Sequence, residues 1–220
     1  MSSALPASTP PFPYNIDDAL PPFQPEMYMN DTLNDCVIAA RAHHTIRLVW
    51  DRIRQLITIA SGDVSREYFR ETGNRNSGLN LQKSLAEWQS PGWLIGTDPT
   101  ERKIQGFSSS SGIQGGTCPG NDATNAINEQ QLQAAIFANI GVQINLILPK
   151  TISVNTSSFG DDHPWQDTTG VPKSLHVMLL TGYDQLGFIG ITWGQRQKMT
   201  WPFLQKYCFG VFTVVGSEST

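Results

Sequence analysis

Residues 34–59, NDCVIAARAHHTIRLVWDRIRQLITI, carry the clearest helical pattern of the chain. From Cys36 onward, apolar residues recur at helical spacing, and they are Val37, Ile38, Ala40, Ile46, Leu48, Val49, Trp50, Ile53, Leu56 and Ile57. Asp35 or Asn34 can supply a side-chain oxygen that caps the first turn. We therefore predict one largely buried helix from Cys36 to about Ile59.

Cys36 lies in the first turn of this predicted helix. Unpaired backbone N–H groups and the positive end of the helix dipole favour a thiolate at that position, and the thiolate is the nucleophilic form of cysteine. Cysteine is also among the most buried residue types, so a helix that simply enters the core explains the same position. The position by itself therefore leaves a nucleophile and a core residue both open.

His176 begins an apolar strand, HVMLLTGYD, that follows a polar loop. An imidazole at the end of a strand can project into a cleft, accept a thiol proton and pair with the thiolate. A half-buried histidine with no role in chemistry fits the same pattern. His43 and His44 lie two helical turns beyond Cys36, too far along the helix to reach its sulfur.

Residues 26–220 are predicted to form a single α+β domain. Shorter helices are expected at 79–88, 129–139 and 201–206, and strands at 142–148, 175–181, 188–193 and 211–215. Residues 105–125 are rich in Gly and Ser and predict a long loop. We expect a helical lobe over about 26–125 and an antiparallel sheet lobe over about 126–220, with a cleft between them. Residues 1–25 are rich in proline and predict an extended arm on the domain surface.

Composition narrows the class of protein. The chain has 220 residues, 39% of them hydrophobic and 15% charged, which is typical of a packed globular protein. A net charge of -4 without any basic run argues against nucleic acid as a partner, and no apolar run is long enough for a membrane span. Three cysteines and no secretory signal predict a soluble cytoplasmic protein. No cysteine or carboxylate spacing suggests a metal, and no cofactor is expected.

The order of these segments resembles the papain-like cysteine peptidase superfamily. That family carries a glutamine six residues before the cysteine that opens a helix, and later a "GPV-V-I" strand, "HAV--VGYG" and "NSWG". The matching segments are Asn30 and Cys36, then GVQINLI at 141–147, HVMLLTGYD at 176–184 and ITWG at 191–194. The resemblance covers roughly residues 27–215 and depends on order and spacing together. It implies a two-lobed papain-like α+β fold.

A group of bacterial and fungal papain-like proteins resembles the chain more closely. Its members carry "GNDRLGDC-IAA--H" near the front and "GHAV-VVGYD--G---ITWG---RMTW-FW--Y" near the end. The corresponding segments are MNDTLNDCVIAARAH at 29–43 and LHVMLLTGYDQLGFIGITWGQRQKMTWPFLQKY at 175–207.

The resemblance implies roles for residues at matching positions. Cys36 would attack a carbonyl carbon and His176 would carry the proton. Asn30 stands in place of the usual glutamine, so its amide would donate to the oxyanion, although an Asn there can also only cap a turn. The family orients its histidine with an Asn or Asp just before "SWG", and this chain has Thr192 there, sixteen residues after His176.

Other residues could complete the site. Asp184 and Gln195 are alternatives to Thr192 for orienting the imidazole. Trp193 could shield that hydrogen bond from water or simply pack in the core. The loop at 153–174, which contains Trp165, could shape the entrance to the cleft or lie in solvent without a function.

Three functions follow from this pattern. The first is a thiol hydrolase that cleaves a peptide or amide bond through an acyl-thioenzyme. The second is an acyltransferase or cyclase that passes a small acyl group to another nucleophile in biosynthesis. The third is a papain-like binding module whose weakened triad no longer turns over.

Overall fold

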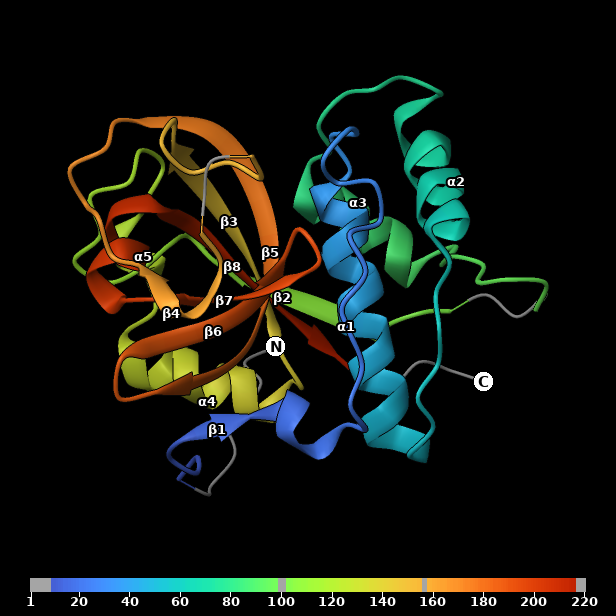
Figure 1. Ribbon diagram of the computed structural model, residues 1–220, viewed down its shortest axis with the longest axis horizontal. Coiled ribbons are helices and arrows are strands. Elements are labelled where there is room, and N and C mark those ends of the chain that lie inside the picture. The colour runs from blue at the N-terminus through green and yellow to red at the C-terminus, as the bar shows by residue number, and fades with distance from the viewer. Residues whose placement is uncertain (1–8, 99–101, 156–157, 217–220) are drawn as a thin grey trace.

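The computed structural model describes residues 9–98, 102–155 and 158–216, and its helices and strands form two parts (Figure 1). Three helices stand together on one side: α1 (Cys36–Ile53), α2 (Ser61–Thr72) and α3 (Leu81–Gln89). A twisted sheet occupies the other side, accompanied by α4 (Glu129–Ala138) and α5 (Trp201–Tyr207). The α+β class is confirmed, with a helical part and a sheet part.

Within the described ranges, eight strands form one sheet. They are β1 (Tyr14–Asn15), β2 (Gly106–Ser110), β3 (Val142–Pro149), β4 (Gly160–Trp165), β5 (Pro172–Asp184), β6 (Gly187–Thr192), β7 (Gln195–Met199) and β8 (Cys208–Val215). The order is β2-β8-β3-β5-β6-β7-β4, with β1 paired to β5. Every pairing is antiparallel except β4 with β7, which is parallel.

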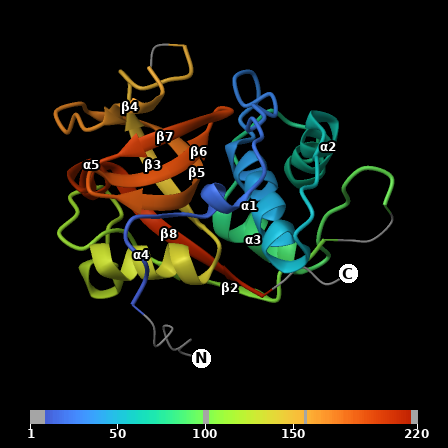
Figure 2. The same ribbon diagram turned by 60° about the horizontal axis from the view of Figure 1, so that its bottom comes forward.

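Each face of the sheet is covered by a different set of helices. Val177 and Phe212 pack in one apolar cluster with α1, α2 and α3, whereas Met178 and Val211 pack in a second cluster with α4 and α5. Figure 2 shows α4 lying along the strands on the side away from α1. Because side chains of a strand alternate between faces, β5 and β8 contribute to both cores. No helix in the described ranges is long and apolar enough to cross a bilayer.

The long helix is shorter than predicted. It ends at Ile53, because Arg54 takes a left-handed conformation (φ 55°) and donates its N–H to the Trp50 carbonyl. Residues 55–60 then continue without helical structure, and Ile59 packs in the helical core. The helix α2 was missed because its sequence, SGDVSREYFRET, is mostly polar and buries only one narrow face.

Two further segments differ from expectation. Residues 105–125 contain β2, which pairs with β8, and Ile113 packs in the sheet-side core, so this segment belongs to the sheet rather than to the helical lobe. The polar strands β4 and β7 were not predicted, since neither GDDHPW nor QRQKM shows an apolar alternation.

The N-terminal arm is more than a surface segment. Its described part, residues 9–25, includes β1 and a 3-10 helix, η1 (Ile16–Ala19), and it buries Ile16 and Leu20. Asp17 forms an ion pair with the buried Arg47 of α1 at 2.7 Å. The arm therefore connects the helices to the sheet. Another 3-10 helix, η2 (Ala123–Asn125), lies outside the arm and follows β2.

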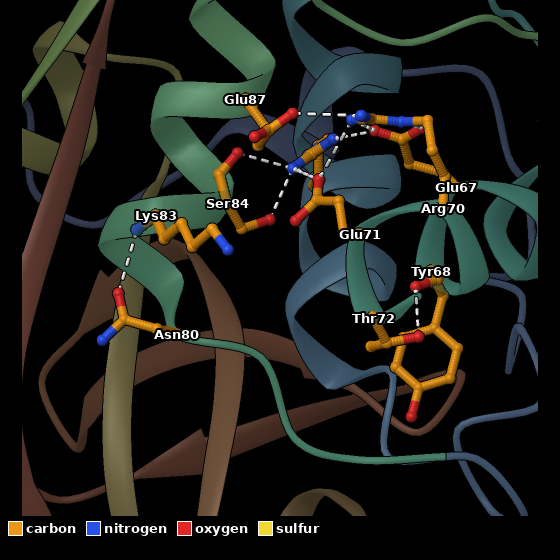
Figure 3. Close-up of polar contacts among 10 residues, drawn as sticks. Glu67, Tyr68, Arg70, Glu71, Thr72, Asn80, Lys83, Ser84 and Glu87 are labelled. Carbon is orange, nitrogen blue, oxygen red and sulfur yellow. Dashed lines mark hydrogen bonds and ion pairs between the residues drawn. The ribbon is translucent and has the colours of Figure 1, made fainter. Parts of the chain in front are cut away.

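A buried ion-pair cluster joins the three helices of the helical part. Arg41 of α1 is 1% exposed and lies 2.8 Å from Glu67 and 2.6 Å from Glu71, both on α2. The same guanidinium donates to the Ser84 carbonyl on α3 at 2.6 Å. Figure 3 shows Glu67, Glu71 and Ser84 converging from the two helices. This cluster holds α2 and α3 against the helix that begins with Cys36.

Candidate active site

A cavity of about 920 Å³ lies where the helical and sheet parts meet. Its lining comes from the loop before α1, the loop before α3, the start of β5 and single positions on neighbouring strands. These residues are Asn30, Asp31, Thr32, Leu33, Asn34, Cys36, Gly78, Leu79, Asn80, Leu81, Asn145, Ser153, Val154, Lys173, Ser174, Leu175, His176, Val177, Trp193 and Phe209. Four of the predicted site residues, Asn30, Cys36, His176 and Trp193, therefore border one space.

Cys36 is the first residue of α1 and is half-buried in the cavity wall. Asp35 occupies the N-cap position, but its side chain makes no capping bond, contrary to our expectation. A hydrogen bond with the backbone of Val177 places the thiol beside the residue that follows His176. Burial raises the pKa of the Cys36 thiol to about 11, and hydrogen bonds with the backbone oppose that rise only in part.

His176 lies on β5 and is 6% exposed. Its Nε2 is 2.6 Å from Thr192 Oγ1. The strand register explains this contact: Leu179 pairs with Ile191, so alternation places His176 and Thr192 together on the opposite face of the sheet. When Nε2–H donates to the hydroxyl, the imidazole lone pair lies on Nδ1 and can accept a proton. Burial lowers the pKa of His176 to about 3.

Trp193 covers the imidazole. Its ring stacks on His176 with centroids 4.4 Å apart and planes at 29°. The residue lies in the two-residue turn between β6 and β7, where Trp193 (φ 47°) and Gly194 (φ 66°) both have left-handed conformations. Trp165 of β4 is buried 6.0 Å from the Trp193 ring, so it supports this tryptophan from behind and does not line the cavity.

Asn30 stands on the wall of the cavity that also carries Cys36. Its side-chain Nδ2 donates to Asp35 Oδ1 at 2.8 Å. Its backbone N–H donates to the Met27 carbonyl, which closes a turn, and Tyr28 and Met29 have left-handed conformations. The amide is thus held by a structured loop immediately before the helix.

The two alternative orienting residues lie elsewhere. Asp184, at the far end of β5, forms an ion pair with Lys198 Nζ at 2.7 Å. Gln195 is exposed, and its backbone pairs with Thr192 across the β6–β7 turn. Neither residue lines the cavity, so the structure brings only Thr192 to the imidazole.

Two residues near the site were missed in the sequence. Asp35 is completely buried, and Asn76 accepts from the Asn34 backbone N–H at 3.0 Å and from the Tyr68 hydroxyl at 2.9 Å. Asn76 thereby ties the loop before Cys36 to the segment after α2. No periodicity or motif marks a polar side chain that acts through loop contacts such as these. The loop at 153–174 reaches the cavity through Ser153, Val154, Lys173 and Ser174.

Burial opposes charging Cys36 or His176 alone, so the directions of both pKa shifts favour a neutral thiol and a neutral imidazole. This corrects the expectation that the helix N-terminus by itself lowers the thiol pKa. Transfer of the proton from Sγ to the imidazole creates two opposite charges together, and their attraction offsets part of the desolvation cost. The arrangement suits a nucleophile activated by an adjacent base at the moment of attack.

Comparison by sequence gave no match, either to a protein-family model or to a curated protein. Solved structures do match. Xylellain, a cysteine protease from Xylella fastidiosa, has a TM-score of 0.66 at 13% identity over 97% of this chain and 90% of that one. The cysteine protease CMS1MS2 of Carica candamarcensis, solved with E-64, has a TM-score of 0.61 at 14% identity over 94% of this chain and 99% of that one.

A third similar structure holds the cysteine protease and lectin-like domains of Cwp84, a surface layer associated protein of Clostridium difficile. Its TM-score is 0.63 at 8% identity, and the match covers 100% of this chain but 53% of that one. Similarity at these identities establishes the fold and leaves the chemistry to the site itself. The chain has the fold of the papain-like cysteine proteases.

Proposed function

We propose that this protein is a papain-like thiol enzyme that cleaves a peptide or amide bond through an acyl-thioenzyme on Cys36. The observation that carries the proposal is that Cys36 at the start of α1 and His176 on β5 open onto one cavity, with His176 oriented by Thr192. The sequence segments at 29–43 and 175–207 support placing the chain in the bacterial and fungal papain-like group described above.

In the proposed mechanism, Sγ of Cys36 attacks the carbonyl carbon while His176 takes the thiol proton on Nδ1. The carbonyl π electrons move to oxygen, which the Asn30 amide and the Cys36 backbone N–H stabilise. The tetrahedral intermediate collapses and expels the amine, which receives the proton from His176. Water then attacks the thioester with His176 again as base, and the acid is released as Cys36 recovers its proton.

The cavity supports a neutral substrate with both apolar and amide groups. Apolar side chains such as Leu79, Leu81 and Phe209 share its wall with amides such as Asn80 and Asn145. Lys173 and Asp31 are the only charged side chains on the wall among the described residues. A peptide segment with uncharged side chains fits this lining better than a multiply charged ligand.

The deciding experiment uses E-64, the compound bound to the Carica candamarcensis neighbour. The purified protein is incubated with E-64 at pH 7 and mapped by mass spectrometry, with Cys118 and Cys208 as internal controls because both are buried. We expect one adduct on Cys36, its loss in Cys36→Ala, and at least tenfold slower labelling in His176→Ala. Equal labelling of all three cysteines would refute the proposal that this protein is a thiol enzyme.

A papain-like binding module is the second candidate, because a threonine in place of an amide or carboxylate orients the imidazole less strongly. Turnover separates the two. Hydrolysis of p-nitrophenyl acetate and of a mixture of fluorogenic peptide amides is expected from the enzyme and is lost in Cys36→Ala. Peptide binding without turnover, unchanged by Cys36→Ala, would establish the module.

A further inference from the structure

The residue immediately before the nucleophile is a buried carboxyl group that the mechanism above does not use. Asp35 is 0% exposed, although its neighbours Asn34 and Cys36 both line the cavity. One carboxyl oxygen accepts from Asn30 Nδ2 at 2.8 Å, and the other has no hydrogen-bond partner among the described residues. A buried acceptor left without a partner is costly, so a purely structural role would not select this side chain.

The contact with Asn30 gives the carboxyl group a consequence at the cavity. A side-chain amide carries two N–H donors, and Asp35 takes one of them. The second N–H of Asn30 then remains available on the wall that Asn30 shares with Cys36. An amide fixed in this way needs no reorganisation when negative charge develops on a substrate oxygen, which is the requirement for an effective oxyanion donor.

We propose that Asp35 is a positioning residue that holds the Asn30 amide toward the carbonyl oxygen under attack, and that it does so as a neutral acid. The proposal rests on the proposed function, since it assigns Asn30 to the oxyanion of a thiol-catalysed reaction. A neutral carboxyl group still accepts through its carbonyl oxygen. An ionised carboxylate adds a negative charge near the developing oxyanion and near the sulfur that must lose its proton.

The surroundings of Asp35 make its ionisation a measurable event. Burial raises the pKa of the Asp35 carboxyl to about 6, the hydrogen bond from Asn30 opposes this rise, and Asp31 on the same loop adds to it. Burial is the main cause of the raised pKa of Cys36 on α1 and of Tyr68 on α2, and the charge of Asp35 adds to both rises, so these two titratable groups lie near it. Turnover governed by Asp35 should therefore fall as pH rises through about 6.

The test measures acylation by p-nitrophenyl acetate in Asn30→Ala, Asp35→Ala, Asp35→Asn and the double alanine variant. Loss of one oxyanion donor lowers kcat about 100-fold or more, which we expect for Asn30→Ala. Asp35→Ala should lower kcat at unchanged KM, and the double variant should be no slower than Asn30→Ala. Asp35→Asn keeps an acceptor oxygen without the charge, so it should retain kcat at pH 5 and lose the decline above pH 6.

The matched control is Asp63→Asn. Asp63 is also a buried carboxyl group, but it accepts from the Gly96 N–H away from the cavity.

A second readout needs no turnover. In the resting protein, the side-chain ¹⁵N signal of Asn30 should titrate near pH 6 in the wild type and stay constant in Asp35→Asn. Additive losses in the double variant, or an Asn30 signal that ignores pH in the wild type, would overturn the role of Asp35 while Cys36 remains an active nucleophile. A wild-type protein that neither labels with E-64 nor turns over would overturn the proposed function itself, and the oxyanion role with it.

Discussion

Thr192 Oγ1 lies 2.6 Å from His176 Nε2, at the position where the papain-like pattern has an amide or a carboxylate. The two side chains meet because β5 and β6 are antiparallel neighbours whose register places both on the same face. A hydroxyl can accept the imidazole N–H and fix the tautomer, but it brings no negative charge to balance an imidazolium. This geometry favours a positioned base over a permanently charged pair.

Thr192→Val tests this dependence directly. The valine keeps the shape and removes the acceptor, so the imidazole loses its orientation, and we expect kcat/KM to fall about 10-fold to 100-fold, the equivalent of about 1.5–3 kcal/mol. Thr192→Asn should retain most of the activity. The control is Thr181→Val, a buried threonine of the same sheet whose hydroxyl has no partner among the described residues. Equal losses in both valine variants would contradict a role in orientation.

The pH dependence of thiol labelling should reveal the base. In His176→Ala, nothing accepts the proton of Cys36, and burial holds the thiol pKa at about 11. The iodoacetamide rate of this variant should therefore climb tenfold per pH unit from pH 7 toward 11, because only the thiolate fraction reacts. The wild type should label at least tenfold faster than the variant at pH 7. Identical profiles for the two proteins would show that the imidazole does not assist the thiol.

Buried histidines should make the fold sensitive to acid. Burial lowers the pKa of His43 to about 3, of His44 to about 4 and of His176 to about 3. Between these values and the unfolded value of about 6.5, the unfolded chain binds more protons, so the free energy of unfolding falls as pH falls. Each histidine contributes at most about 1.4 kcal/mol per pH unit in that window. Asp35 acts in the opposite direction, since its pKa is raised.

His43→Phe isolates one of these contributions. The phenyl ring can keep the tilted ring contact with Tyr28, whose ring centroid lies 4.9 Å from that of His43. Urea unfolding from pH 7 to pH 4.5 should give a slope of free energy against pH that is shallower than in the wild type by about 1.4 kcal/mol per unit. A parallel pair of curves would mean that His43 takes up its proton equally in the folded and the unfolded chain, so that burial does not lower its pKa.

The ion-pair cluster around Arg41 should contribute more to the free energy of unfolding than a surface ion pair does. Arg41→Ala leaves Glu67 and Glu71 without their buried partner, and breaking a buried pair from one side costs about 3–5 kcal/mol of unfolding free energy. Arg54→Ala, whose pair with Asp51 is exposed at 3.6 Å, should cost about 0.5 kcal/mol or less. Denaturant titration of the two variants measures the difference. Similar costs would show that the helices α1 to α3 hold together through apolar packing alone.

Much of the fold could be predicted from the sequence where a segment is buried on one side with a clear period. The helix that begins at Cys36, the strand that follows Gly141 and the strand that contains His176 all show such a period, and the structure has each of them. Polar elements were missed for the converse reason. The helix α2 and the strands β4 and β7 are held by neighbouring elements and by ion pairs. None of the three shows an apolar pattern in the sequence.

The site shows the same division. The resemblance to the papain-like pattern selected Thr192 by its separation from His176, and the register of two paired strands brings the two side chains together. Asp184 and Gln195 had the right chemistry at nearby positions, but the first pairs with Lys198 and the second lies in solvent beyond the turn. The buried carboxyl group of Asp35 could not be found from sequence, because its importance comes from a loop that brings Asn30 back to it.

The turn that carries Trp193 gives the sharpest test of how the arm supports the site. A Cβ on Gly194 would lie 3.0 Å from Met27 N and 3.2 Å from Pro25 O, both backbone atoms of the segment before α1. Gln24 Nε2 also donates to the Gly194 carbonyl at 3.0 Å. Gly194→Ala should therefore displace either this segment or the turn, and with the turn the indole that covers His176.

Gly73→Ala provides the matched control for this variant. Gly73 has nearly the same backbone conformation (φ 64°) as Gly194 (φ 66°), yet a Cβ there would meet nothing within 4 Å. Both variants bear the cost of a left-handed alanine, about 1–2 kcal/mol. Gly194→Ala bears an additional overpacking cost of about 1–3 kcal/mol. It should also lower kcat, whereas Gly73→Ala should leave it unchanged. Equal stability and equal kcat in the two variants would mean that the arm moves aside without cost. The contacts of the arm with Gly194 would then not fix the position of Trp193 over the imidazole.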